Sequence, residues 1–268
     1  MLRGTPTLNT PSNDSTPDNS VTGSNTGDDY ANLIQHGLTE AVQARFSVIR
    51  DKDSELVPGR VARVDGITTF VHGNSSDYRA VSTFARIAHD DEFEIEPAQP
   101  TVGDWILIRP GHDLDPDEIE LVLARSSLLV RKRVQRGKEE GDEQVLAANI
   151  DTVFIVQAAT YFNSNRLERE IALVWGSGAV PVVILSKVDL LEGTDPAEVI
   201  ALAESSAPGV EVFAASGITG EGTDPLRRYT AAGNSVVLIG ASGVGKSTLI
   251  NQLMGHEVMD NGEIREAD

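Results

Sequence analysis

The nine residues GASGVGKST, at positions 240–248, restrict the fold of this chain more than any other stretch. They satisfy the pattern G-x-x-x-x-G-K-[ST], in which glycines let successive backbone N–H groups point at phosphate oxygens. The pattern belongs between a buried strand and a helix, and here the apolar run SVVLIG leads into it and STLIN continues from it. A glycine-rich turn without a ligand is the competing interpretation, and it leaves this context unexplained.

The residues of this phosphate-binding loop (P-loop) have separate predicted roles. Lys246 is expected to neutralise the β- and γ-phosphates of a nucleotide, and the Ser247 hydroxyl is expected to ligate Mg²⁺. A helix starting near Lys246 adds the positive end of its dipole. The residues predicted to hold the phosphates are Gly240, Ala241, Ser242, Gly243, Val244, Gly245, Lys246, Ser247 and Thr248.

The P-loop closes an alternating pattern that begins near residue 149. Strands are predicted in DTVFIVQAAT, VPVVILSKVDL, GVEVFAAS and SVVLIG. Helices are predicted in NRLEREIALVWGSG, EVIALAESS and TDPLRRYTAA, the first of them stopped by glycine. Strands that alternate with helices indicate a mostly parallel α/β sheet, and ligands bind beyond the carboxyl ends of such strands.

Two of the earlier strands end in loops that fit a guanine nucleotide. Ser186, Lys187, Val188 and Asp189 resemble the Asn/Thr-Lys-x-Asp sequence of guanine-nucleotide proteins, in which the Asp carboxylate accepts from guanine N1–H and from the exocyclic amino group. The Lys187 stem is expected to lie along the purine face. Ser216 and Gly217 resemble the Ser-Ala-Lys loop that braces guanine. Each loop is weak evidence alone, and their order beside a P-loop makes the combination strong.

The residues before this sheet predict a different kind of domain. Residues 1–38 are rich in Ser, Thr, Asn and Asp and are expected to be a disordered tail. Residues 39–130 contain five short apolar runs separated by turn residues, which predicts a small closed β-barrel with an OB-fold as the leading choice. Residues 131–148 are expected to be a linker, basic in its first half and acidic in its second.

Composition narrows the functional classes. The formal net charge of −19 argues against a general nucleic-acid binder, although the basic run from Arg125 to Lys138 could form a local patch or simply a solvated linker. The absence of cysteine leaves no disulfide and no thiolate metal site. With no membrane-length apolar run and no signal peptide, a cytoplasmic protein, acting as a monomer without membrane contact, is expected.

In ordinary small GTPases the P-loop comes first and the guanine loops come last, whereas here the order is SKVD, then SGIT, then GASGVGKST, which amounts to a circular permutation. With PTVGDW in the barrel, EQVLAANID at the junction and GEIRE near the end, the chain resembles the ribosome small-subunit-dependent GTPases of the RsgA/YjeQ type. The resemblance covers residues 39–268. It implies an OB-fold followed by a circularly permuted GTPase domain (149–268), GTP hydrolysis to GDP during late maturation of the small ribosomal subunit, and contact with its rRNA.

The chain departs from that family in three ways. Ser186 replaces the usual Asn or Thr, which is expected to weaken binding by about 0.5–1.5 kcal/mol while keeping guanine selectivity. The first switch and the Asp-x-x-Gly loop of the family do not occur, so no catalytic residue is assigned and slow hydrolysis is expected. The zinc module of complete members has no counterpart in this sequence. Because the SVVLIG strand would lie at an exposed sheet edge, we expect a fragment of a longer gene product or a chain that is poorly stable alone.

Two other functions stay open. A non-hydrolysing RNA- or ribosome-binding module would use the barrel and the basic run. An ATP-using P-loop enzyme would require SKVD to be a coincidence.

Overall fold

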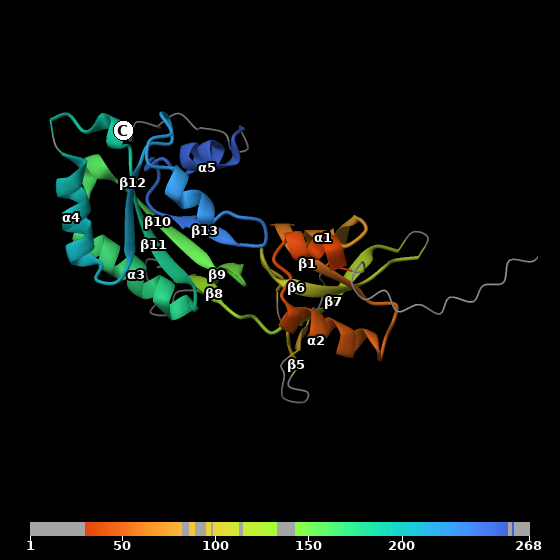
Figure 1. Cartoon of the computed structure of the whole chain (residues 1–268). Helices are drawn as coiled ribbons and strands as arrows, with labels where there is room; N and C mark the ends of the chain where they lie inside the picture. Colours follow the sequence, from red (N-terminus) through yellow and green to blue (C-terminus); the bar gives the residue numbers. More distant parts are fainter. Residues whose placement is uncertain are drawn as a thin grey trace, which may run out of the picture.

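A computed structural model of the chain describes residues 30–81, 86–88, 95–97, 99–112, 115–132, 143–193, 195–256 and 259. An antiparallel barrel with two leading helices lies beside a parallel α/β sheet, and a short hairpin lies between them (Figure 1). Within these residues, none of the helices combines the length and apolar composition needed to cross a lipid bilayer.

The barrel closes through five strands. They are β1 (Val57–Asp65), β2 (Thr68–Gly73), β3 (Asp77–Val81), β6 (Trp105–Arg109) and β7 (Asp117–Leu123). Strand β1 pairs antiparallel with both β2 and β6, and a parallel pairing of β3 with β7 closes the ring. This ring confirms the predicted OB-like barrel. Residues 78–88, one of the five apolar runs, contribute to two strands, β3 and β4 (Arg86–Ala88), and β4 pairs with β5 (Ile95–Pro97) and β7.

Two helices precede the barrel and change the predicted boundary at residue 38. Helix α1 (Ala31–Gln35) and helix α2 (Glu40–Arg50) pack on the barrel through Leu33 and Phe46, both fully buried in a cluster with Trp105. The Thr39 side chain caps α2 by accepting from the Val42 amide. Residues 30–38 therefore belong to the folded part of the chain, while residues 1–29 lie outside the described residues.

The predicted linker at 131–148 is bounded by strands. Strand β8 (Leu128–Lys132) pairs antiparallel with β9 (Glu143–Ala148), and the intervening residues lie outside the described range. Leu129 of β8 is fully buried in the core of the α/β sheet, which is why the hairpin belongs to that domain.

The α/β domain contains four parallel strands in the order β12-β11-β10-β13. They are β10 (Thr152–Ala158), β11 (Val180–Ser186), β12 (Glu211–Ala215) and β13 (Val236–Ile239). This order confirms the predicted parallel sheet. Among the described strands β13 pairs with β10 alone, so it lies at the edge, as expected, but its side chains are half-buried rather than exposed.

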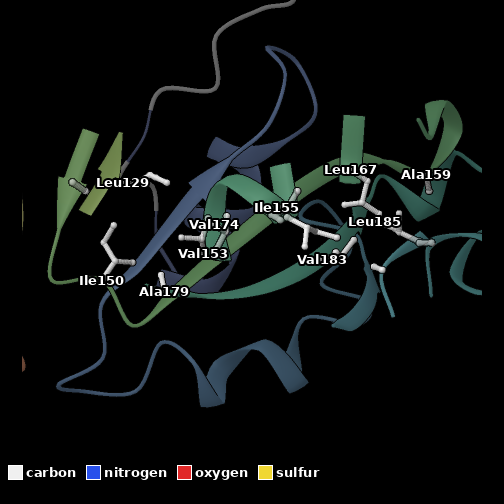
Figure 2. Packing of buried hydrophobic residues seen from close by; sticks show 14 of the residues in the cluster. Leu129, Ile150, Val153, Ile155, Ala159, Leu167, Val174, Ala179, Val183 and Leu185 are labelled. Atoms are coloured by element: carbon white, nitrogen blue, oxygen red, sulfur yellow. The ribbon is translucent and has the colours of Figure 1, made fainter. Parts of the chain in front are cut away.

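Helices cover both faces of this sheet. Helices α3 (Ser164–Ser177) and α4 (Pro196–Ser206) pack on one face, where Val153 and Val183 lie against Leu167 and Val174 (Figure 2). Helix α5 (Lys246–Met254) packs on the other face through Leu249 and Leu253. The helix predicted in TDPLRRYTAA is shorter than expected, a 3₁₀ turn, η4 (Asp224–Arg228), anchored by buried Leu226.

Candidate nucleotide-binding site

Three loops meet at the carboxyl edge of the parallel sheet. The P-loop (residues 240–248) follows β13, the SKVD loop (residues 186–189) follows β11, and the SGIT loop (residues 216–219) follows β12. Because these strands are parallel within one sheet, their carboxyl ends lie on the same edge whatever the order along the chain. The permuted sequence order therefore produces one spatial cluster.

The P-loop depends on glycine at defined positions. Gly240 has φ of 147°, and a Cβ there would overlap the Val156 carbonyl of β10. Gly243 and Gly245 have φ of 74° and 97°, and Gly245 is the N-cap of α5. At Gly243 no atom lies within 4 Å of the position that a Cβ would take, so only its backbone angle requires glycine. The loop thus turns tightly beside β10 and leads into α5.

The Lys246 ammonium lies inside the P-loop. Its Nζ donates to the carbonyl oxygens of Gly240 at 3.0 Å and Ala241 at 2.7 Å. Partial burial lowers the pKa of Lys246, and the positive charge of nearby Arg166 lowers it further, against the opposite effect of Glu170. The ammonium is therefore held at the position where a phosphate could replace the two carbonyl contacts.

Ser186 joins the SKVD loop to the P-loop. It is 3% exposed, and its hydroxyl lies 2.5 Å from the Val244 carbonyl oxygen and 3.2 Å from the Gln157 carbonyl oxygen. One hydroxyl hydrogen is shared between these two acceptors. The role predicted for Ser186 in reading guanine does not match this placement, because its donor is turned toward the protein backbone. Its part in the site is to position the two loops.

The rest of the SKVD loop divides into buried and exposed side chains. Lys187 has φ of 60°, and its Cε lies 3.8 Å from the position that a Cβ on Gly245 would take. The Lys187 stem therefore lies next to Gly245 of the P-loop. Val188 is 8% exposed and its side chain packs in the core, which makes it an anchor of the loop, and its assignment as a nucleotide contact stays a prediction. Asp189 is exposed in the short helix η3 (Val188–Leu190).

The SGIT loop lies directly against the first turn of α5. Ser216 is fully buried, and its hydroxyl accepts from the amides of Ile218 and Thr219. A Cβ on Gly217 would lie 2.9 Å from the Leu249 nitrogen and the Thr248 carbonyl carbon. Ser216 therefore shapes its own loop, and Gly217 permits the close approach to the P-loop helix.

Sequence reasoning missed Gln157 at the end of β10. It is 4% exposed; its side-chain oxygen accepts from the Asn163 amide at 3.0 Å, and its carbonyl accepts from Ser186. Its Nε2 lies 3.5 Å from a carboxylate oxygen of Glu170, which also pairs with Arg166. A polar residue directly after the apolar run from Val153 to Val156 was the available signal. Gln157 ties α3 to the strand beneath the P-loop.

Ser247 is the residue of this site that could serve as a ligand to a divalent cation. Ser247 lies in the first turn of α5, one residue after Lys246, and is partly exposed. A hydroxyl oxygen at this place is a ligand type that Mg²⁺ uses beside phosphate oxygens. In the described residues, no group of three or more His, Asp or Glu side chains is arranged to hold a metal by itself.

The fold and this edge define a P-loop nucleotide-binding domain in which the P-loop comes last, preceded by an OB-like barrel. The solved structure of YjeQ from Thermotoga maritima is similar, with a TM-score of 0.54 and 22% identity over 74% of this chain and 65% of that one. YloQ, described as a circularly permuted GTPase, gives a TM-score of 0.50 and 19% identity over 74% of this chain and 63% of that one. These likenesses concern the fold.

Sequence comparison identifies the family. The family model described as RsgA GTPase matches residues 122–268. The small ribosomal subunit biogenesis GTPase RsgA 2 of Lactiplantibacillus plantarum is 36% identical over 88% of this chain and 64% of its own length. The RsgA protein of Streptomyces avermitilis is 38% identical over 88% of this chain and 60% of its own length. The chain belongs to the RsgA GTPase family and spans less than two thirds of these relatives.

Proposed function

We propose that this chain binds GTP and GDP at the edge formed by its three loops, as part of a GTPase that acts in biogenesis of the small ribosomal subunit. The observation that carries the proposal is the bond from the Ser186 hydroxyl to the Val244 carbonyl, because it joins the SKVD loop to a P-loop 58 residues away. Phosphate binding is assigned to the P-loop and base recognition to Asp189. The relatives' names supply the connection to the small subunit.

Base selectivity is assigned to the exposed Asp189 carboxylate. It can accept from both N1–H and the exocyclic amine of guanine, whereas adenine offers no matching pair of donors. Sites built on such hydrogen bonds discriminate by about 10⁴-fold when a partner is missing. The Gly217 amide, which has no hydrogen-bond partner among the described residues, is available to a base oxygen on the other side.

Ser247 would hold Mg²⁺ together with the phosphates, and the ion would neutralise charge on the β- and γ-phosphates. Slow hydrolysis by this chain alone stays a prediction. It is checked by measuring phosphate release under single-turnover conditions, and turnover equal to that of a complete small GTPase would contradict it.

Calorimetric titration tests the nucleotide assignment. GDP and GTP should bind in the presence of Mg²⁺, while ADP and ATP should bind at least about 100-fold more weakly. The base-reading role of Asp189 is tested by Asp189→Asn. Asp224→Asn is its matched control, because Asp224 is an exposed aspartate on the same domain, with side-chain exposure of 94%. Equal affinity for ATP and GTP would support the ATP-using enzyme instead.

A second candidate function, RNA binding by the barrel, is favoured by one row of side chains. Phe70 on β2 lies opposite Arg63 of β1 and Arg79 of β3. The two guanidinium carbons lie 4.9 and 5.3 Å from the Phe70 ring centroid. Such an arginine–aromatic row suits stacking on bases and contact with phosphates, which is how OB-folds bind single strands.

The basic run that first suggested RNA binding contributes less. Arg125 is only 12% exposed and is paired with buried Asp104, while Arg133, Arg136 and Lys138 lie outside the described residues. Co-sedimentation with small subunits, with and without a GTP analogue, separates the two functions. Binding to the small subunit that is independent of the nucleotide and is lost in Phe70→Ala favours the RNA-binding module. Binding that requires the GTP analogue favours the GTPase.

A further inference from the structure

The barrel and the α/β domain share a joint built around one arginine. Arg60 of β1 donates to the Asn149 carbonyl at 3.0 Å and to the Ser235 hydroxyl at 2.6 Å, both in the α/β domain. It also donates to the His36 carbonyl, and its guanidinium lies 4.8 Å from the Trp105 ring centroid. A planar guanidinium can serve three acceptors and an aromatic face at once.

Burial makes this contact costly to replace. Desolvation lowers the pKa of Arg60, while the negative charges of Asp151 and Asp104 act in the opposite direction. Removing the guanidinium would take away the hydrogen bond that it donates to each of the half-buried carbonyls of Asn149 and His36. A lysine could satisfy only part of the set, because its ammonium is a single point on a flexible stem.

The joint holds the strand that carries the P-loop. Ser235 immediately precedes β13, and its amide donates to the Asp151 carboxylate at 2.7 Å. Two residues earlier, the Gly233 amide donates to the Gln35 carbonyl of α1 at 3.0 Å. Since β13 pairs with β10 alone among the described strands, these contacts at its start restrain a strand that has one free edge.

We propose that Arg60 is a positioning residue that couples the barrel to nucleotide binding, by holding the start of β13 through Ser235 and the adjoining domain through Asn149. The coupling rests on the proposed nucleotide binding. Such coupling is reciprocal. A partner bound to the barrel therefore changes the affinity for nucleotide, and bound nucleotide changes the surroundings of Arg60 and Trp105 in the barrel.

The chain carries its own reporters for each domain, because it has two tryptophans. Trp105 lies beneath Arg60 in the barrel, and Trp175 lies on α3 with 55% exposure. In a Trp175→Phe chain, GDP is expected to change the Trp105 emission, and Arg60→Lys is expected to remove that change. Arg109→Lys is the control, because Arg109 pairs with Asp53, Glu55 and Glu120, all within the barrel and its leading segment.

Calorimetry on the same chains separates the coupling from nucleotide binding itself. Arg60→Lys should weaken GDP binding by about 5- to 20-fold, as expected for a coupled site, and Arg109→Lys by less than about 2-fold. Absence of GDP binding by the parent chain overturns the proposed function. GDP binding with an unchanged Trp105 signal, or with the same signal change in Arg60→Lys, overturns the coupling.

Unfolding gives a test that needs no nucleotide. Urea denaturation followed in Trp105→Phe and Trp175→Phe chains should give coincident midpoints for the two domains, and Arg60→Ala should separate them. Midpoints that stay coincident in Arg60→Ala would overturn the role of Arg60 in joining the domains.

Discussion

At its carboxyl end, β13 runs into a loop of glycines whose backbone faces a ligand site, whereas at its amino end the strand starts between side chains of two domains. Gly240 and Gly245 shape the first end through positive φ angles and the absence of side chains. Arg60 and Asp151 fix the second end through hydrogen bonds to Ser235. The difference indicates that one end of this short strand is built to receive phosphate and the other to be held in place.

The joint also contains an ion pair that makes no contact with the nucleotide site. Asp104 is fully buried, and both of its oxygens accept from Arg125, at 2.8 and 2.7 Å. Burial raises the pKa of Asp104, and Arg125 opposes that rise. The pair therefore gives a way to loosen the joint without altering the P-loop.

The largest expected effect is the loss of stability when the Arg125–Asp104 ion pair is broken. Arg125→Leu leaves a buried carboxylate unpaired and should lower the free energy of unfolding by about 3–5 kcal/mol at pH 7. Without Arg125 the folded-state pKa of Asp104 rises further above its unfolded value, so the loss should shrink as pH falls through that raised pKa toward the unfolded value of 3.8. Urea titrations of the parent chain and Arg125→Leu at pH 7 and pH 5 measure this loss of unfolding free energy.

The control for the ion pair is Arg109→Leu, which removes a half-exposed arginine with 37% side-chain exposure. Its cost should be about 1 kcal/mol or less. An Arg125→Leu loss that is the same at both pH values would contradict the assigned role of Asp104.

The next effect concerns the glycines at the other end of β13. Gly240→Ala should lower the free energy of unfolding by about 3 kcal/mol or more and remove measurable GDP binding, because its Cβ would overlap the Val156 carbonyl. Gly243→Ala has only the unfavourable φ to overcome and should cost about 1 kcal/mol. Thermal unfolding and GDP calorimetry compare them, and equal losses at the two positions would refute the packing argument.

Lys246→Ala should weaken GTP binding by about 1.5–3 kcal/mol, since a charge-assisted contact to phosphate is lost. GDP should lose less, because the γ-phosphate is absent. The ratio of the two affinities, measured by calorimetry with Mg²⁺, is the informative number. An unchanged ratio would mean that the ammonium does not reach the γ-phosphate.

The smallest effect is expected at Ser186. Ser186→Ala removes the hydroxyl that bonds Val244 and Gln157 and should weaken GDP binding by about 0.5–1.5 kcal/mol. Guanine over adenine selectivity should stay unchanged, because the hydroxyl faces the protein. A selectivity change in this variant would restore the sequence-based view that Ser186 contacts the base.

The parts of the fold that follow from local pattern were predictable. The strands β10 to β13 are apolar runs bounded by turn residues, and α3 ends at Gly178, whose φ is 84°. The loops at the carboxyl edge followed from their motifs. Helix α1 was missed because its five residues sit beside a polar tail, and it is stabilised by the burial of Leu33 rather than by its own propensity.

The residues that the sequence did not reveal act through distant partners. Arg60 and Ser235 are 175 positions apart, and a polar side chain on a strand looks the same whether it faces solvent or another domain. Ser186 was assigned from its motif, yet the direction of its hydroxyl is set by Val244 and Gln157. Such roles depend on tertiary geometry that no local window contains.

The assignment of Asp189 as the base-reading residue is tested most directly by Asp189→Asn titrated with GDP and with xanthosine diphosphate. Xanthine carries an oxygen in place of the exocyclic amine, so an amide that accepts from N1–H and donates to this oxygen fits it. GDP affinity should fall about 100-fold and xanthosine diphosphate affinity should rise by a similar factor. Unchanged affinities for both nucleotides would contradict the guanine site.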